Sequence, residues 1–123
     1  MTNSVDETSV REAIGYYIDG MRDANVATLE KAFHEQAILC GYLGDELIAA
    51  PIVGLYEWVA SQPAPEGFEC SVLSVELTGR VATATVRETS HGETVLDHFH
   101  LLKVQDRWSI VSKLWDTEPN RAA

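Results

Sequence analysis

The chain has few of the residues that mark several classes of protein. Only two of its 123 residues are cysteines, Cys40 and Cys70, and their spacing fits neither a disulfide framework nor a metal site. No apolar run approaches the ~20 residues of a membrane-spanning helix. The polar, acidic N-terminus lacks the apolar segment of a secretory signal. We therefore expect a cytoplasmic protein whose cysteines are buried, reduced thiols.

Positive charge is scarce as well. Nine Lys and Arg residues face 19 Asp and Glu residues, which gives a formal net charge of −10. A surface this acidic repels phosphate backbones and anionic lipids. We therefore expect neither a nucleic-acid partner nor a membrane partner. The eight glycines are scattered singly, with no phosphate-binding loop, and no serine sits in a G-x-S-x-G elbow. No cofactor is implied.

What the chain does have is helical periodicity in its first half. The sequence Ser4-Val5-Asp6-Glu7 matches a capping box and predicts the start of a helix. Asn25 is a good N-cap for a second, short helix, and Pro51 suits the first turn of a third. Each helix has one apolar side. In the first helix this side is formed by Val10, Ile14, Tyr17, Ile18 and Met21. In the second it is formed by Val26, Leu29, Ala32 and Phe33, and in the third by Ile52, Leu55 and Val59.

The second half alternates between apolar and polar residues. A strand over 37–43 turns at Gly44-Asp45 and returns through 46–48. From 68 to 116 the alternation is broken only at 78–80, 90–93 and 105–107, which predicts a meander. Helices followed by a meander predict a single α+β domain over residues 1–123, with three N-terminal helices packed on one face of a curved antiparallel or mixed sheet.

The last hairpin decides which side chains face the helices. A two-residue loop at Gln105-Asp106 puts Leu101 opposite Ile110 and Phe99 opposite Ser112. One face then carries Asp97, Phe99, Leu101, Trp108, Ile110, Ser112, Leu114 and Asp116. The other carries Leu96, His98, His100, Leu102, Val111, Lys113 and Trp115. The first face has the continuous apolar stretch, so we expect it to face the helices, and we expect the second to meet a partner subunit.

Three short strings carry a family resemblance: Ala32-Phe33-His34-Glu35-Gln36-Ala37, Leu101-Leu102-Lys103-Val104 and Trp108-Ser109-Ile110-Val111-Ser112-Lys113. With the order of elements, they make the chain resemble the NTF2-like superfamily of ketosteroid isomerases and SnoaL-like cyclases, and within it the putative lumazine-binding branch. The resemblance implies a cone-shaped fold with a pocket between the helices and the concave face of the sheet. It also implies a homodimer through the outer face, here Leu96, His98, His100, Leu102, Val111 and Trp115.

The ketosteroid isomerases offer a test of catalysis. They combine a base carboxylate with a tyrosine and a protonated aspartate that hold an oxyanion. Tyr17 and Asp97 match the tyrosine and the aspartate, but Gly41 stands at the position of the base. Glycine cannot abstract a proton, so the resemblance disfavours steroid isomerisation.

The candidate catalytic residues are Asp97, Tyr17 and His34. Asp97 either faces the interior, where burial would raise its pKa, or lies near a strand end and pairs with Arg80, Arg87 or solvent. His34 either serves chemistry or contacts the carbonyl end of the second helix. The expected ligand contacts are Tyr17, Trp58, Asp97, Phe99 and Ser112, and either tryptophan, Trp58 or Trp115, could instead simply pack.

His98 and His100 share one face of a strand, yet no third ligand has a suitable spacing, so no metal site is predicted. Three functions stay open. The preferred one is binding of a small apolar or aromatic molecule in the pocket. The others are an acid–base enzyme of the cyclase or isomerase type, acting on a carbonyl or cyclic substrate, and a homodimerisation domain with a vestigial pocket.

Overall fold

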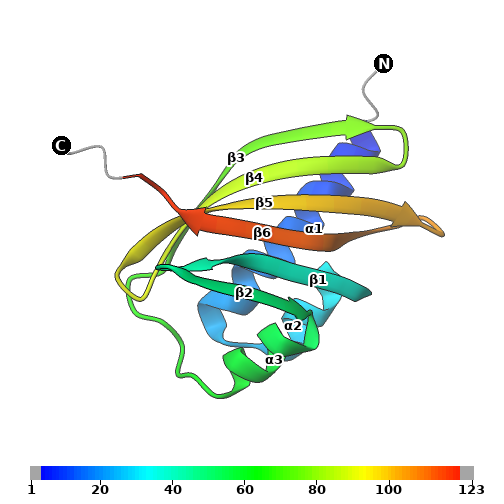
Figure 1. Ribbon diagram of the computed structural model, residues 1–123. Helices are drawn as coiled ribbons and strands as arrows, with labels where there is room; N and C mark the ends of the chain where they lie inside the picture. The colour runs from blue at the N-terminus through cyan, green and yellow to red at the C-terminus, as the bar shows by residue number, and fades with distance from the viewer. Residues whose placement is uncertain (1–3, 120–123) are drawn as a thin grey trace.

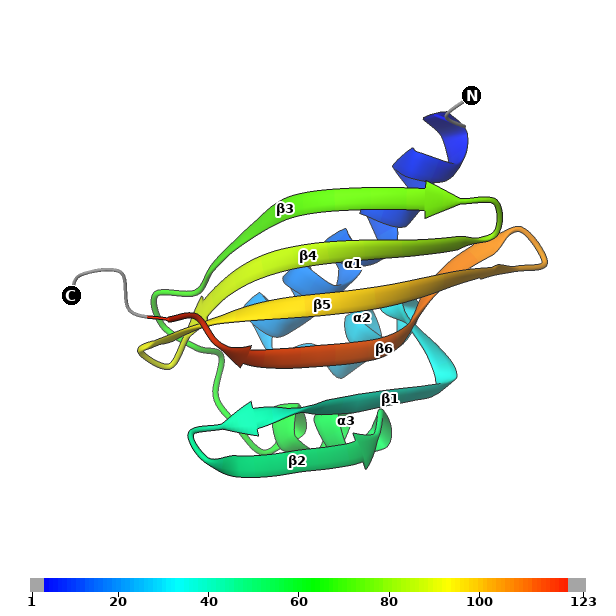
Figure 2. The same ribbon diagram turned by 45° about the horizontal axis from the view of Figure 1, so that its top comes forward.

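The computed structural model describes residues 4–119 and places three helices on one face of a six-stranded sheet (Figures 1 and 2). The α+β prediction is confirmed, and residues 1–3 and 120–123 of the predicted domain lie outside the described part. The helices are α1 (Ser4–Asp23), α2 (Val26–Ala32) and α3 (Val53–Ala60), and the strands are β1 (Phe33–Leu43), β2 (Glu46–Pro51), β3 (Glu69–Thr78), β4 (Val81–Ser90), β5 (Glu93–Val104) and β6 (Arg107–Thr117).

The sheet is open and mixed. Its order is β2-β1-β6-β5-β4-β3, in which β1 and β6 run parallel and every other neighbouring pair is antiparallel. The parallel contact joins the hairpin that follows α2 to the end of the chain. Because of this contact, segments from both halves of the sequence line the space between the sheet and the helices. None of the helices within residues 4–119 is long and apolar enough to cross a membrane.

The helix predictions hold, with two exceptions at boundaries. Phe33, predicted on the apolar side of the second helix, has an extended backbone and begins β1. Asn25 caps α2, where its side chain accepts a hydrogen bond from the Thr28 amide at 3.2 Å. Pro51 does not lie in the first turn of a helix. It ends β2, opposite Ile38, and α3 begins two residues later. The Ile52 amide donates to the Ala37 carbonyl at 2.9 Å, so hydrogen bonding to β1 extends past the proline before the helix starts.

The meander turns fall where the sequence predicts them. His91 and Gly92 both have positive φ, at 54° and 82°, and so do Gln105 and Asp106, at 50° and 64°. Two consecutive left-handed residues are the geometry of the tight hairpin turns that match the twist of antiparallel strands. The two-residue loop predicted at Gln105-Asp106 is therefore present.

A β-bulge in β6 overturns part of the predicted register. Leu101 lies opposite Ile110 as expected, but His100 then pairs with Ser112 and Phe99 pairs with Lys113, which leaves Val111 as an extra residue. Beyond the bulge the two faces of β6 exchange, because side chains alternate along a strand.

The outcome for the face assignments is therefore mixed. Trp108, Ile110, Phe99 and Leu101 are buried and His98 and His100 are exposed, which confirms that part of the prediction. Past the bulge the prediction is wrong: Ser112, Leu114 and Asp116 share the outer face with the histidines, whereas Lys113 and Trp115 share the inner face with Phe99 and Asp97.

Trp115 lies across the backbone of Gly41, its partner in the parallel β1–β6 pair. A Cβ added at Gly41 would overlap the indole ring of Trp115, so only glycine leaves room for this packing. The resemblance placed a catalytic base at this position in the isomerases. Here an aromatic ring covers it.

We predict that Gly41→Ala lowers the free energy of unfolding by about 1–3 kcal/mol, because the added methyl forces Trp115 or the strand to move. The matched control is Gly15→Ala in the middle of α1, where an added Cβ meets nothing within 4 Å. The control should raise stability by about 0.5–1 kcal/mol through helix propensity. Urea denaturation of the three proteins measures both values, and equal stabilities for wild type and Gly41→Ala would contradict the packing described.

Candidate functional site

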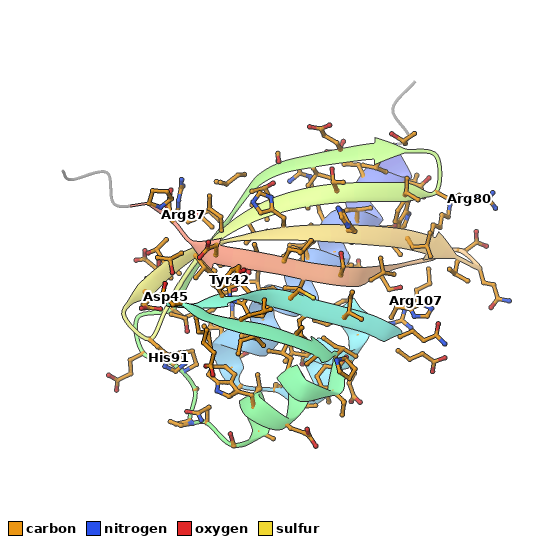
Figure 3. All side chains as sticks on the ribbon, in the orientation of Figure 1. Tyr42, Asp45, Arg80, Arg87, His91 and Arg107 are labelled. Atoms are coloured by element: carbon orange, nitrogen blue, oxygen red, sulfur yellow. The ribbon has the colours of Figure 1, made fainter. Side chains whose placement is uncertain are left out.

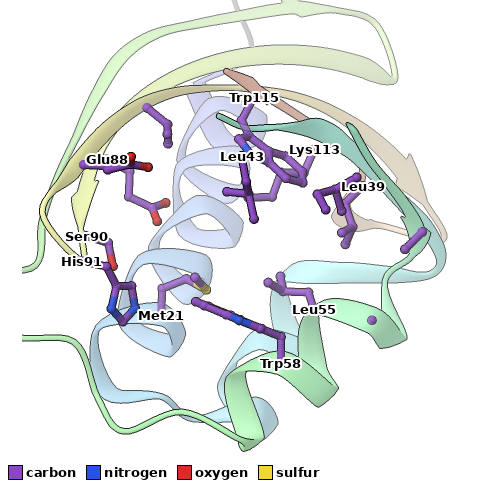
Figure 4. Close-up of a pocket in the computed structure, with 15 residues that line it drawn as sticks. Met21, Leu39, Leu43, Leu55, Trp58, Glu88, Ser90, His91, Lys113 and Trp115 are labelled. Atoms are coloured by element: carbon purple, nitrogen blue, oxygen red, sulfur yellow. The ribbon is translucent and has the colours of Figure 1, made fainter. Parts of the chain in front are cut away.

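A cavity of about 410 Å³ opens between α3, the β1–β2 hairpin and the β4–β5 turn (Figure 4). Its volume is typical of sites for small molecules, which range over ~300–1,000 Å³. Most of its lining is apolar: Met21, Leu39, Leu43, Ile48, Ala50, Gly54, Leu55, Trp58, Val95 and Trp115. The polar lining is Glu88, Ser90, His91, Glu93 and Lys113.

Two tryptophans lie on different walls of the cavity (Figure 4). Trp58 projects from α3 and is 44% exposed, with its ring edge-on to His91 of the β4–β5 turn at a centroid distance of 5.6 Å. Trp115 enters from β6 and packs over Gly41. An aromatic ring on each side suits a flat, apolar guest, because rings gain by stacking or by edge-to-face contact.

The inner wall carries a cluster of polar side chains from adjacent elements. Glu88 of β4, Asp97 of β5 and Lys113 of β6 all face the helices, and Tyr17 of α1 reaches them from the opposite layer. The Tyr17 hydroxyl donates a hydrogen bond of 2.5 Å to Glu88 Oε1. The Lys113 Nζ lies 3.1 Å from Asp97 Oδ1, and these two side chains are only 9% and 0% exposed.

Asp97 depends on that ion pair. Neither of its carboxylate oxygens makes a hydrogen bond of regular geometry to any residue in the range 4–119, and both are buried. An unpaired buried charge is costly, so the Lys113 ammonium is what stabilises the carboxylate. The same ammonium lies 3.9 Å from the centroid of the Trp115 ring, a cation–π contact that fixes its position at the cavity wall.

Glu88 and Tyr17 hold their protons at neutral pH. Burial raises the pKa of Glu88 to about 8, the negative charge of Asp97 adds to this rise, and Lys113 opposes it. Burial, followed by the charges of Asp97 and Glu88, raises the pKa of Tyr17 well above its usual value. The cluster therefore contains a neutral carboxylic acid, a neutral phenol and one compensated ion pair.

The sequence-predicted site residues separate into three groups. Trp58 lines the cavity. Tyr17, Asp97 and Phe99 are fully buried behind the cavity wall and do not line it. Ser112 lies on the outer face, where its hydroxyl hydrogen-bonds His100 Nδ1 at 2.9 Å, so its expected inward orientation is wrong because of the bulge.

The alternative pairings considered for Asp97 do not occur. Arg87 instead forms a bidentate ion pair with Glu118, in which its Nε and Nη2 each donate to a carboxylate oxygen at 2.9 Å. Tyr17 and Asp97 belong to one cluster, but the hydroxyl of Tyr17 is bonded to Glu88.

His34 lies apart from this cluster. It lines a separate hollow with Glu30, Tyr56 and Arg107, and its Nδ1 accepts the Gln36 amide at 3.0 Å. The C-terminal carbonyls of α2, which His34 was considered to contact, instead accept hydrogen bonds from the Arg107 guanidinium at 3.1 and 3.4 Å. The structure therefore does not bring His34 together with Asp97 and Tyr17.

Sequence reasoning missed Glu88 and Lys113, the two members of the cluster that line the cavity. Glu88 had a usable signal: Ala82, Ala84, Val86 and Glu88 alternate along β4, and the first three are buried. Lys113 had none, because the bulge that turns it inward leaves no mark in the alternation of the sequence.

The open mixed sheet, the three helices on one face and the cavity at one end of it define an NTF2-like α+β domain. Residues 5–116 match the family described as putative lumazine-binding, and the chain belongs to this family. The resemblance to the NTF2-like superfamily and the resemblance to its putative lumazine-binding branch are thus both confirmed. No curated protein matches the chain.

Several solved structures share the fold over nearly the full chain. An NTF2-like protein of unknown function from Shewanella baltica OS155 has 26% identity and a TM-score of 0.88, covering 98% of this chain and 99% of its own. One from Methylobacillus flagellatus KT has 26% identity and a TM-score of 0.87, covering 96% of both chains. A third, from Silicibacter pomeroyi DSS-3, has 22% identity and a TM-score of 0.86, covering 96% of this chain and 100% of its own.

Removing the ammonium should expose the cost of the buried carboxylate. We predict that Lys113→Met lowers the free energy of unfolding by about 3–5 kcal/mol, because Asp97 is left charged, buried and unpaired. The double variant Lys113→Met/Asp97→Asn should recover most of this loss, since neither residue then carries a charge. Chemical denaturation of both variants provides the measurement, and a double variant no more stable than Lys113→Met would contradict the pairing.

Proposed function

We propose that the protein binds a small, largely apolar or aromatic molecule in the cavity between the sheet and α3. The observation that carries this proposal is a cavity of about 410 Å³ with tryptophans on two walls and a mainly aliphatic remainder. The name of the family points the same way, since lumazine is a flat bicyclic compound. Binding sites of this kind combine apolar walls with a few placed polar groups.

Acid–base catalysis is a second candidate, favoured by the state of Glu88. A protonated carboxylic acid that reaches the cavity and titrates near neutral pH has the properties of a general acid. Glu88 would then be the group that meets the substrate. Asp97 and Tyr17 would set its protonation from behind the wall. His34 has no place in this scheme.

The pocket proposal predicts that Trp58 contributes to affinity. Titration with a flat aromatic probe, 2-acetylnaphthalene, should quench tryptophan fluorescence and saturate. Trp58→Ala should weaken binding by about tenfold, or ~1.4 kcal/mol, through loss of one aromatic wall. The control is Leu73→Ala on β3, which removes an apolar side chain of nearly equal exposure (45%) outside the cavity lining and should leave affinity unchanged. Absence of saturable binding in the wild type would refute the proposal.

We further propose that the outer sheet face forms a homodimer interface. The bulge changes its composition: Trp115 is not on this face, and Leu114 takes its place beside His98 and His100. By the strand register, Leu114 continues into an apolar strip across β6, β1 and β2, formed by Leu114, Ile38, Tyr42 and Leu47, which are 41–62% exposed. Exposed apolar patches of this kind mark interaction surfaces.

A charge placed in this strip should separate the subunits. Leu114→Glu is expected to convert a dimer into a monomer, as measured by sedimentation equilibrium, because a dimer would bury the carboxylate without a partner. Val53→Glu, at an α3 residue that is 51% exposed, serves as the control and should remain dimeric. A wild-type protein that sediments as a monomer at high micromolar concentration would refute this second proposal.

A further inference from the structure

Within residues 4–119, the middle of the outer sheet face carries no charged side chain, although 23% of the residues in the chain are Asp, Glu, Lys or Arg. By the strand register, two rows of outward-facing side chains cross β4, β5 and β6 there: Thr83, His100 and Ser112 in one, and Thr85, His98 and Leu114 in the other. On β1 and β2 these rows continue into the apolar strip of the outer face. Charged residues are depleted from the cores of protein interfaces in the same way, which supports a face that is covered in the assembled protein.

The charged groups nearest this region lie toward the ends of the sheet. Figure 3 shows Arg80 and Arg107 at one end and Arg87 toward the other. The charge of Arg87 is compensated by Glu118, and Asp116 lies near the end of β6. Two copies of a chain with a net charge of −10 repel each other, and an uncharged face is where they can meet without placing like charges in contact. The charge distribution therefore favours a second copy of this chain as the occupant of the face.

His98 and His100 are the residues of these two rows that gain a positive charge as the pH falls, because histidine is the side chain that ordinarily changes charge between pH 5 and pH 8. Both are exposed in the single chain. Each ring Nδ1 hydrogen-bonds a neighbouring hydroxyl group, that of Ser112 for His100 at 2.9 Å and that of Thr85 for His98 at 3.4 Å. A hydroxyl group can donate to a neutral ring or accept from a protonated one, so these contacts permit both charge states.

Neither histidine forms an ion pair with a carboxylate within residues 4–119. The charged groups nearest to His98 on the adjacent strands are Arg87 of β4 and Asp116 of β6, each two residues along from the side chain opposite it. Arg87 is already paired with Glu118, so Asp116 is the group that favours a charged ring at His98. The outward-facing residues beside His100 on β4 and β6 are uncharged.

Groups farther away on this face do not supply a counter-charge at the rings. Glu76 of β3 lies beyond Thr83, two strands from His100. Cys40 and Tyr42 of β1 lie beyond β6 and gain no positive charge as the pH falls. A second copy that covers the face would therefore bury each imidazolium with little compensation, and a two-fold pair contains two copies of each ring. Buried charges without partners are costly, so protonation opposes this contact.

We infer that pH controls the proposed homodimer, which forms while His98 and His100 are neutral and dissociates when they become protonated. The inference rests on the proposed dimer and adds its regulation. The monomer binds protons at these two rings more readily than the dimer does, because water solvates the charge in the monomer. Proton uptake is therefore linked to dissociation, and the dissociation constant rises as the pH falls through the range in which histidine titrates.

Sedimentation equilibrium of the full chain at pH 7.5 and pH 5.5, at one ionic strength, tests this control. We expect the dissociation constant of the wild-type dimer to be at least about tenfold higher at pH 5.5, the effect of excluding one proton over one pH unit. The overall charge of the chain predicts the opposite change, because carboxylates begin to take up protons and the repulsion between two acidic chains falls.

The outcomes separate the inference from the proposal on which it rests. A dissociation constant that is unchanged or lower at pH 5.5 overturns the inference and leaves the dimer standing. A wild-type protein that is already monomeric at pH 7.5 refutes the dimer itself. Circular dichroism of each sample distinguishes dissociation from acid unfolding.

Replacing the histidines in pairs tests which of them respond. His98→Gln/His100→Gln keeps polar side chains that do not titrate, so its dimer should be no weaker at pH 5.5 than at pH 7.5. The matched control is His34→Gln/His91→Gln, which removes the other two histidines of the chain; these line the second hollow and the cavity, and the control should keep the wild-type response. Glu88, whose pKa burial raises to about 8, lies on the inner face and is present in both variants.

A weakening at pH 5.5 that survives in His98→Gln/His100→Gln, or that is lost in the control, overturns the role assigned to these two histidines. The wild-type measurement decides whether the dimer responds to pH even if a variant does not fold.

Discussion

The ion pair between Lys113 and Asp97 is the interaction on which the interior of this protein depends. Both groups have left water, and neither oxygen of the aspartate has a regular hydrogen bond within residues 4–119 to replace it. Without the lysine, a carboxylate would lie unpaired beneath the sheet, at a cost that few small domains could tolerate. With it, three adjacent strands carry ionisable side chains on a face that is otherwise the hydrophobic core.

The pair also sets the state of its neighbours. Because Asp97 is negatively charged, Glu88 beside it binds its proton more firmly. The Tyr17 hydroxyl donates its hydrogen bond to this neutral carboxyl group. Because Lys113 is held between Asp97 and the ring of Trp115, its ammonium lies at the cavity wall. The positions of Glu88 and Lys113 at the cavity wall are thus tied to one buried charge and to the ammonium that compensates it.

Membership of the putative lumazine-binding family and the likeness to NTF2-like structures establish the scaffold, and scaffolds of this kind support unrelated functions. What distinguishes this chain is local. At Gly41, where the isomerases of the resemblance carry a base, an indole ring packs against bare backbone. Two of the polar groups that reach the cavity, Glu88 and Lys113, come instead from β4 and β6, on either side of the aspartate that the resemblance singled out.

The sequence by itself determined the order of elements, the apolar stripes of the helices, the turns of the meander and the family, because these features are written in local periodicity and in residues such as Asn25 and Gln105-Asp106. It also put Tyr17 on the inward stripe of the first helix and Asp97 on the strand face expected to meet the helices, but it left open a pairing of Asp97 with Arg80 or Arg87. Only the tertiary structure decided which residues reach the cavity. One extra residue, Val111, turns Lys113 and Trp115 inward and Ser112 outward, and whether a strand accommodates a bulge depends on its partner strands and on the packing across the sheet, which no short window of sequence contains.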